Sequence, residues 1–356
     1  MRTLLARLAR TPVDPYVLLL LGTVGVATLL PARGAAATGA SGAATVVVGL
    51  LFLLYGMRLS TREALAALAH WRLHVTVLAA TFVVFPALGL AARVLVPYVL
   101  TPALYSGFLF LTLVPSTVQS SIALTSIARG NVSAAICAGS FSSLVGVVLT
   151  PLLAAALTGG RVRGTGGSLG AAVVEILLQL LAPFLAGQLL RRWTARFVQR
   201  HRRILGLVDR ASIVLVVYTA FSEGVARGIW HQITPVQLVV LLGVEAVLLA
   251  VMLCLTWYGA GQLGFGREDR IAIQFAGSKK SLAAGLPMAS VLFGPQASLA
   301  VLPLMLFHQM QLMVGAVIAR SRARDLRPAG PQGPCLLSRA RRHFVQVRRH
   351  EPPSGK

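Results

Sequence analysis

Apolar segments long enough to cross a membrane recur along the first 320 residues of the chain. A transmembrane helix needs about 20 mostly apolar residues. Ten such segments are separated by short polar connections, at about Pro15–Leu30, Ala43–Met57, Leu73–Val96, Pro102–Ile127, Val132–Leu157, Leu169–Leu190, Ile204–Ser222, Pro235–Tyr258, Arg270–Phe293 and Gln296–Ala319. Only 12% of the residues are charged and 56% are hydrophobic, whereas a soluble domain carries about 25% charged residues. The sequence therefore predicts an all-α polytopic membrane protein with ten transmembrane helices.

Basic residues are distributed unevenly between the expected loops. The chain has 33 Lys and Arg against 10 Asp and Glu, a formal net charge of +23. With ten spans, 26 basic residues fall on one side of the membrane and 5 on the other, and Lys279 and Lys280 lie inside a span. Because basic loops stay in the cytoplasm, we expect a protein integral to the plasma (inner) membrane, with both termini cytoplasmic and no nucleic-acid partner. A cleaved secretory signal, with a basic start and an apolar run from Tyr16 to Leu30, is the alternative interpretation of the first span.

The two halves of the chain resemble one another. A shift of 160 residues places Ser121 on Ser281 and the start of the first span near the start of the sixth. Five spans in each half would give the halves opposite orientations, which is an inverted repeat. We expect a cytoplasmic N-terminus (1–14), a first five-helix repeat (15–157), a loop (158–168), a second five-helix repeat (169–319) and a basic, disordered cytoplasmic tail (320–356).

The fourth and ninth spans are interrupted at corresponding places, at 115–125 and 277–287, by Pro, Gly and polar residues. Paired interruptions of this kind mark the binding site of many secondary transporters, because unwinding exposes backbone groups and half-helix dipoles. Irregular backbone at membrane depth persists only where protein or a wet cavity satisfies its polar groups. The alternative is that Pro and Gly merely kink two helices. We predict a substrate- and ion-binding site at Ser116, Thr117, Gln119, Ser120, Ser121, Thr125, Ser278, Lys279, Lys280 and Ser281.

The lysine pair is the most informative part of that set, because an ammonium at membrane depth needs a cavity or a partner. Lys279 could attract an anionic substrate beside the N–H groups of a half-helix, or it could release a proton and couple transport to a proton gradient. One of the two lysines could instead have a structural role. The possible charge partners are the membrane acids Glu175, Glu223 and Glu245. His308, which lies with Gln309 and Gln311 in the last span, is a possible proton relay or a packed histidine.

Three segments carry a resemblance to a known family: Leu113–Ala123, Ile127–Val132 and Gly277–Met288. They resemble the bile acid:sodium symporter superfamily, in particular its SBF-like sodium-dependent transporter branch, over residues 15–320. The resemblance implies a ten-helix fold with a panel domain and a core domain. In that fold helices four and nine are broken and cross near the midplane, and the core moves against the panel during transport.

The chain departs from the sodium ligands that the resemblance implies. The Ser of a Ser-Asn pair is kept as Ser121, but the Asn position holds Ile122. Two hydroxyl positions of the fifth span hold Ala135 and Gly139, and the Glu and Gln positions of the ninth span hold Phe275 and Lys279. Membership of the family therefore does not by itself imply coupling to sodium.

Other functional classes find little support. The cysteines are few and scattered and the histidines are sparse, so we expect no metal site. The sequence shows no catalytic set of residues, so we expect neither an enzyme nor a bound cofactor. The sequence favours a secondary active transporter that works by alternating access in the lipid bilayer. Its small-molecule substrate would be an organic anion or another small solute, coupled to sodium or protons. The alternative is a non-transporting membrane regulator or scaffold that uses the same fold and the basic tail.

Overall fold

The chain folds into helices alone in the part that the computed structural model describes, which is residues 15–58, 70–157, 169–226, 228 and 233–324. The helices are α2 (Pro15–Leu29), α3 (Ala35–Arg58), α5 (Trp71–Ala79), the π-helix η2 (Ala80–Val84), α6 (Phe85–Ala91), the 3-10 helix η3 (Ala92–Leu95), α7 (Pro102–Leu113), α8 (Val118–Ile127), α9 (Val132–Leu157), α10 (Leu169–Arg200), α11 (Arg202–Ala226), α13 (Pro235–Gln262), α14 (Arg267–Gly277), α15 (Leu282–Phe293), the 3-10 helix η4 (Gly294–Gln296) and α16 (Ala297–Arg324).

Six of the helical segments within the described residues are long and apolar enough to cross a membrane, namely Ala35–Arg58, Trp71–Leu95, Val132–Leu157, Arg202–Ala226, Pro235–Gln262 and Ala297–Arg324. The pair α7 and α8 adds a seventh if it is counted as one span, although it bends by 64° at its break. This arrangement agrees with the predicted all-α polytopic membrane protein. The count of ten spans and the inverted repeat stay predictions.

Several helix ends differ from those expected from hydropathy. Helix α3 begins at Ala35, eight residues before the apolar run, and α10 continues to Arg200. Helix α16 continues to Arg324, so the first residues of the expected tail are helical. Hydropathy marks only the apolar part of a helix, whereas backbone hydrogen bonds continue into polar turns. The N-terminus (1–14), the loop (158–168) and residues 325–356 of the tail lie outside the described residues.

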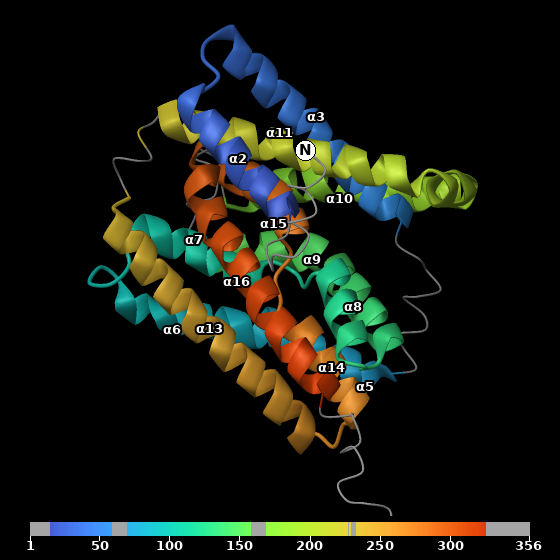
Figure 1. The fold of residues 1–356 in the computed structure, drawn as a ribbon. Coiled ribbons are helices and arrows are strands. Elements are labelled where there is room, and N and C mark those ends of the chain that lie inside the picture. The colour runs from blue at the N-terminus through green and yellow to red at the C-terminus, as the bar shows by residue number, and fades with distance from the viewer. Residues whose placement is uncertain (1–14, 59–69, 158–168, 227, 229–232, 325–356) are drawn as a thin grey trace, which may run out of the picture.

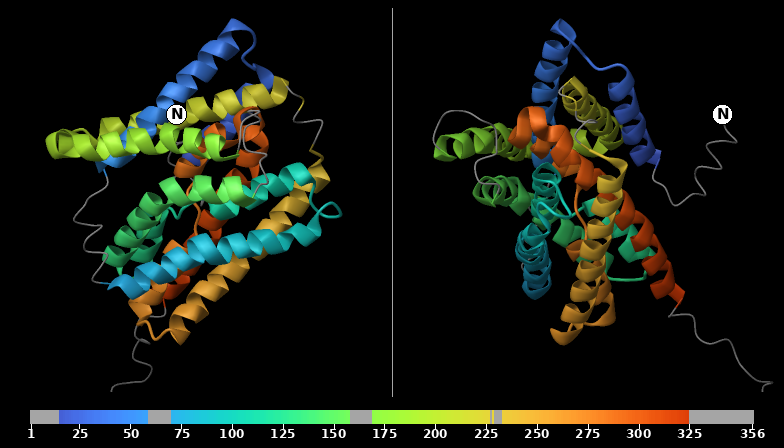
Figure 2. Two further views of the ribbon diagram at one scale, coloured as in Figure 1. Left: turned by 180° about the vertical axis from the view of Figure 1, so that it is seen from behind. Right: turned by 90° about the vertical axis from the view of Figure 1, so that its left-hand side faces the viewer.

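Four helices form one layer of the molecule: α2, α3, α10 and α11 pack against one another at the top of Figure 1 and in both views of Figure 2. We call them the four-helix layer. Its tightest contact joins α3 and α10, where glycines let the backbones touch. A Cβ atom on Gly56 would lie 2.1 Å from the Phe184 carbonyl oxygen, and one on Gly187 would lie 2.1 Å from that of Leu53.

The remaining helices form a second body below that layer, which we call the core body. Its apolar interior contains aromatic pairs in edge-to-face geometry, among them Phe110 with Phe293 at 5.2 Å between ring centroids and Phe85 with Phe307 at 6.2 Å. Helices α13 and α16 run side by side in it, and the two broken pairs α7–α8 and α14–α15 lie at its centre.

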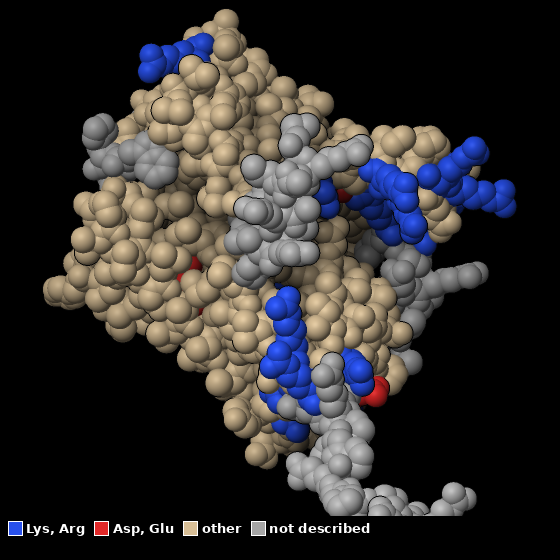
Figure 3. All heavy atoms as spheres, viewed as in Figure 1, with Lys and Arg blue, Asp and Glu red and all other residues tan. Residues whose placement is uncertain are grey.

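The outer surface has few charges on the face drawn in Figure 3. Most of that face is neither basic nor acidic, and Lys and Arg gather near the ends of α10 and α11 and near the ends of α14 and α16. Large apolar side chains are exposed on many helices, including Leu29, Val46, Leu189, Val239 and Val317. A wide apolar band of this kind is expected of helices that face lipid.

Candidate functional site

Two helix breaks meet at the centre of the core body. The first break, 114–117, separates α7 from α8, and the second, 278–281, separates α14 from α15. The backbone N–H of Ser281 donates to the carbonyl of Pro115 at 2.8 Å. In the other direction, the Ser116 hydroxyl donates to the Ala276 carbonyl and the Ser121 hydroxyl donates to the Phe275 carbonyl at 3.1 Å. The breaks therefore satisfy one another's backbone groups, as irregular backbone at membrane depth requires.

The first break follows from Pro115, which has no N–H to continue the helix. The next N–H, of Ser116, donates to the Ser142 hydroxyl at 3.0 Å instead of to the Thr112 carbonyl. The carbonyls at the end of α7 therefore accept from outside their helix. That of Leu113 accepts from the Thr150 hydroxyl at 2.8 Å.

Lys280 fills the space beside these carbonyls. Its Nζ donates to the carbonyl oxygens of Thr112 and Val114, both at 2.8 Å, and to that of Thr81 at 3.0 Å. The Phe85 ring lies below the ammonium, with 4.1 Å between Nζ and the ring centroid. The side chain is completely buried. Lys280 therefore connects η2 and α7 through their backbones.

Lys279 points the other way, toward α16. Its Nζ donates to the Gln311 carbonyl at 3.0 Å and lies 5.9 Å from the centroid of the Phe275 ring. It is 1% exposed, and a Cβ atom on Gly315 would lie 2.9 Å from its Nζ and 2.7 Å from Cδ1 of Leu124. No carboxylate among the described side chains lies within ion-pair distance of either lysine.

Gln311 holds the second break in place. Its side-chain carbonyl accepts from the Lys280 backbone N–H at 2.8 Å, and its amide nitrogen donates to the Lys280 carbonyl at 2.8 Å. The same nitrogen lies 2.8 Å from Nδ1 of His308. If the amide donates there, Nδ1 accepts and the imidazole proton sits on Nε2. His308, the predicted relay, thus belongs to the hydrogen-bond network of the break.

The three predicted charge partners have different surroundings. Glu245 lies on α13, completely buried, and neither carboxylate oxygen has a hydrogen-bond partner. Glu223 is half-buried near the end of α11 and has an interaction of its own. Glu175 lies on α10, but its side chain is outside those that the structure describes. Their pairing with the lysines stays a prediction.

A cavity of about 300 Å³ lies between the four-helix layer and the two breaks. It is lined by Phe52, Tyr55, Arg58, Thr117, Val118, Gln119, Ser140, Ser143, Leu144, Val147, Phe184, Ser281, Ala283, Ala284 and Met288. The lining includes the first turns of both α8 and α15. Because the first N–H groups of a helix have no partner within it, two half-helices present their positive ends here.

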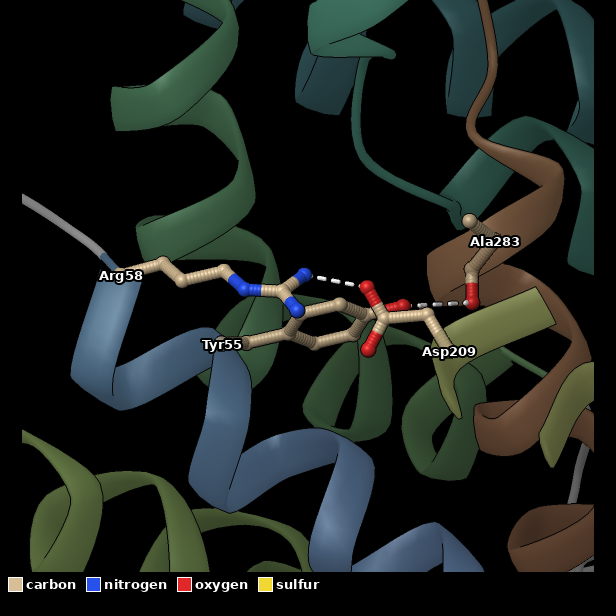
Figure 4. A network of polar contacts seen from close by, with 4 residues as sticks. All are labelled: Tyr55, Arg58, Asp209 and Ala283. Atoms are coloured by element: carbon tan, nitrogen blue, oxygen red, sulfur yellow. Dashed lines mark hydrogen bonds and ion pairs between the residues drawn. The ribbon is translucent and has the colours of Figure 1, made fainter. Parts of the chain in front are cut away.

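A second cavity continues from the first, because Tyr55, Arg58, Gln119 and Ala283 line both. Its other walls add three arginines and one acid: Arg202, Arg203, Arg210 and Asp209. Figure 4 shows the residues at the junction. Arg58 pairs with Asp209 within the four-helix layer. The Tyr55 hydroxyl donates to the Ala283 carbonyl at 3.2 Å, and this bond joins the four-helix layer to the core body.

The predicted site residues divide into four groups. Thr117, Gln119 and Ser281 line the cavity. Ser116, Ser121, Lys279 and Lys280 hold the breaks together, as described above, and the Ser278 hydroxyl donates to the Gln274 carbonyl of its own helix. Ser120 and Thr125 have buried hydroxyl oxygens without a partner. In this conformation neither lysine lines either cavity.

Sequence reasoning did not include Tyr55, Arg58, Asp209 or Gln311 in the site. From the sequence alone, Arg58 is only a basic loop residue. Asp209 lies about two turns into α11 beside several arginines. A polar residue inside an apolar span, such as Gln311, is a signal that could have added it. For Arg58 and Asp209, an ion pair across 151 positions leaves no local pattern.

Comparisons with known proteins identify the family. The sequence profile of the SBF-like CPA transporter family matches residues 14–324. An uncharacterized protein of Pseudomonas aeruginosa is 52% identical over 312 residues, which cover 87% of this chain and 93% of the relative. "Putative symporter YfeH" of Escherichia coli K12 is 47% identical over 308 residues, 86% of this chain and 92% of that protein. Sodium/bile acid cotransporter 7-B of Xenopus laevis is 28% identical over 277 residues, 77% and 80% of the two chains. The chain therefore belongs to the SBF-like CPA transporter family and is an integral membrane protein.

Proposed function

We propose that this member of the SBF-like CPA transporter family is a secondary active transporter, not an enzyme, that moves an organic anion by alternating access. Its ten spans form two inverted repeats of five, with both termini in the cytoplasm. The four-helix layer serves as the panel domain and the core body as the moving core. The transport cycle is coupled to sodium or to protons.

One observation carries this proposal: the cavity at the two breaks joins two half-helix N-termini to an arginine. Val118 and Gln119 of α8 lie opposite Ala283 and Ala284 of α15, and Arg58 stands at the junction with the second cavity. Helix N-termini and guanidinium groups both favour anions, and a guanidinium matches the planar fork of a carboxylate.

The rest of the cavity wall suits the carbon skeleton of such a solute. Phe52 and Phe184 come from the four-helix layer, and Leu144, Val147 and Met288 come from the core body. A small number of polar groups in an otherwise apolar wall is typical of small-molecule sites. We therefore expect a solute with one anionic group and an apolar body, of a size that a cavity of about 300 Å³ accepts.

The position of the cavity supports alternating access. It lies between two bodies rather than inside either, so movement of one body against the other changes which side of it is open. The second cavity brings Arg202, Arg203 and Arg210 to its approach. Under the proposed topology these arginines face the cytoplasm, and they would draw an anion toward the site from that side.

A thermal-shift screen tests the substrate class. Purified protein in detergent is heated with organic carboxylates, organic sulfates and their neutral analogues. We expect anionic compounds with an apolar body to raise the unfolding midpoint and the neutral analogues to leave it unchanged. Equal stabilisation by neutral analogues would contradict the proposed charge selection. Uptake of the best compound into proteoliposomes then tests transport itself.

A matched pair of variants tests the location of the site. Ser143 lines the cavity and its hydroxyl donates to the Gly139 carbonyl one turn earlier. Thr45 makes the same kind of bond, to the Ser41 carbonyl, but is exposed. Ser143→Phe should fill the cavity and abolish ligand stabilisation, whereas Thr45→Phe should preserve it. Ligand stabilisation that survives Ser143→Phe would place the site elsewhere.

The coupling ion is tested separately. Stabilisation by sodium that is lost in Ser121→Ala would support sodium coupling, because Ser121 is the family ligand that this chain keeps. A pH-dependent midpoint that is lost in Lys279→Gln would support proton coupling. Uptake driven equally well without either gradient would overturn the proposal of secondary active transport.

A further inference from the structure

We propose that the carbonyl oxygens of Thr81, Thr112 and Val114 form a binding site for a monovalent cation, and that the Lys280 ammonium permanently occupies it. Lys280 is thus a tethered cation rather than a substrate ligand or a proton carrier. The inference goes beyond the proposed transport function and does not depend on it, because the site is defined by contacts that exist without any substrate.

The geometry requires the charged form of the lysine. Nζ lies 2.8–3.0 Å from three carbonyl oxygens, and a carbonyl can only accept hydrogen bonds. A neutral amine has two N–H groups, whereas an ammonium has three. Only the ammonium gives each of the three oxygens a donor, and the face of the Phe85 ring adds a cation–π contact at 4.1 Å.

The oxygens are available because the backbone around them is irregular, and not because the lysine pulls them out. In a π-helix the Thr81 carbonyl would pair with the N–H five residues ahead, but that residue is Pro86, which has none. The N–H of Phe85 is already committed to the Ala80 carbonyl. Likewise, the Ser116 N–H donates to Ser142 and leaves the Thr112 carbonyl without its helical partner. The carbonyls of Thr81 and Thr112 therefore lack their helical donors whatever side chain stands at position 280.

The chemistry of the site selects a monovalent ion. Three uncharged carbonyls can replace part of the hydration shell of an alkali or ammonium ion, as backbone carbonyls do in potassium channels. A divalent ion such as calcium is usually held by carboxylates, and no described carboxylate lies within ion-pair distance of Lys280. The tether supplies the cation without the entropic cost of binding a free ion.

Lys279 provides a natural contrast. It is equally buried, but its Nζ donates to one carbonyl, that of Gln311. Shortening Lys279 would leave a single acceptor, which is not a cation site. The two adjacent lysines therefore form a matched pair. Both are buried and both carry an ammonium group, but only Lys280 contacts three carbonyl oxygens.

Chemical rescue tests the proposal directly. Lys280→Ala and Lys279→Ala are purified, and their unfolding midpoints are measured in the chlorides of sodium, potassium, ammonium and methylammonium, with N-methylglucamine chloride as the reference. We expect a small cation to raise the midpoint of Lys280→Ala by about 5 °C at about 100 times its Kd. The rise that each salt causes in the wild type, which includes the effect of a coupling sodium ion, is subtracted from the rise in each variant. After this subtraction, Lys279→Ala should show no cation-specific rise. No cation-specific rise in Lys280→Ala, or the same rise in Lys279→Ala, would overturn the proposal.

A second measurement covers the case in which Lys280→Ala does not fold. The chain has three lysines, Lys279, Lys280 and Lys356, so ¹⁵Nζ-lysine labelling of the wild type gives three side-chain signals, assigned with Lys279→Met and Lys356→Arg. We expect the Lys280 signal to be that of an ammonium whose protons exchange at least 100-fold more slowly than those of Lys356. A neutral amine signal, or exchange as fast as that of Lys356, would contradict the tethered cation.

Discussion

The two helix breaks at the centre of the core body do the same structural job with different chemistry. The break between α7 and α8 carries no charge and releases carbonyls at Thr112, Val114 and Pro115. The break between α14 and α15 carries two ammonium groups. The Lys280 ammonium and the Ser281 N–H donate hydrogen bonds to the carbonyls of the first break. The first break thus supplies three carbonyl acceptors and one neutral donor, the Ser116 hydroxyl, and the second supplies a charged donor together with the Ser281 N–H.

This difference teaches how a membrane protein can keep unwound backbone in a dry interior. An unpaired carbonyl in such surroundings costs several kcal/mol, and a neutral side chain donates at most two hydrogen bonds. A single ammonium at Lys280 satisfies three acceptors at once. The charged break should therefore contribute more to stability than the neutral one, and the following variants test that ranking from the largest expected effect to the smallest.

Lys280→Met should have the largest effect. It keeps the length and apolar stem of the side chain but leaves three buried carbonyls without donors. Each such carbonyl costs about 1–3 kcal/mol, so the fold should lose at least about 3 kcal/mol. Lys279→Met, which loses one carbonyl bond, should cost clearly less. The measurement is the unfolding midpoint of each variant in the same detergent. A larger loss for Lys279→Met would reverse the roles assigned to the two lysines.

Gln311→Leu should come second. The Gln311 amide bonds to both backbone groups of Lys280, so its loss should cost about 1–3 kcal/mol. Gln309, two residues earlier, is the control, because neither polar atom of its amide has a partner. Gln309→Leu should be neutral or stabilising by the same measurement. Equal losses for the two variants would mean that the amide of Gln311 does not hold the break.

Ser116→Ala tests the neutral break. The Ser116 hydroxyl joins α14 through the Ala276 carbonyl, and removal of one neutral hydrogen bond of this kind costs about 1 kcal/mol. Ser290→Ala is the control, since that hydroxyl donates within its own helix to the Pro287 carbonyl at 2.8 Å. Thermal unfolding should place Ser116→Ala between Gln311→Leu and Ser290→Ala. A loss as large as that of Lys280→Met would refute the ranking of the two breaks.

Tyr55→Phe should have the smallest effect on stability, about 0.5 kcal/mol, because its bond to the Ala283 carbonyl is long and exposed. Tyr105 makes a bond of the same 3.2 Å length to the Gly89 carbonyl, but within the core body. We expect Tyr55→Phe to change the uptake rate in proteoliposomes and Tyr105→Phe to leave it unchanged. If both changed uptake equally, the Tyr55 contact would not be specific to movement between the two bodies.

Much of the local structure could be predicted from the residues alone. Pro115 marks the end of α7, the polar run after it marks the break, and the apolar runs mark the helices. The same reasoning took Lys279 as the central charge of the site and expected one of the two lysines to be structural. It could not give the partners of either ammonium, because those partners lie on distant segments of the chain. It also treated Arg58 as a topological label, since nothing near it in the chain indicates Asp209.

The chain's hydropathy and its helix breakers thus specify an integral membrane protein with two interrupted helices, because both depend on short stretches of neighbouring residues. The partners of the buried polar groups depend on the packing of distant segments. The Lys280 ammonium reaches Thr112 across 168 positions and Thr81 across 199, and the cavity forms where first turns of α8 and α15 meet α3 and α10. Only the tertiary structure could decide these contacts, because a hydrogen bond depends on distance in space and not on separation along the chain.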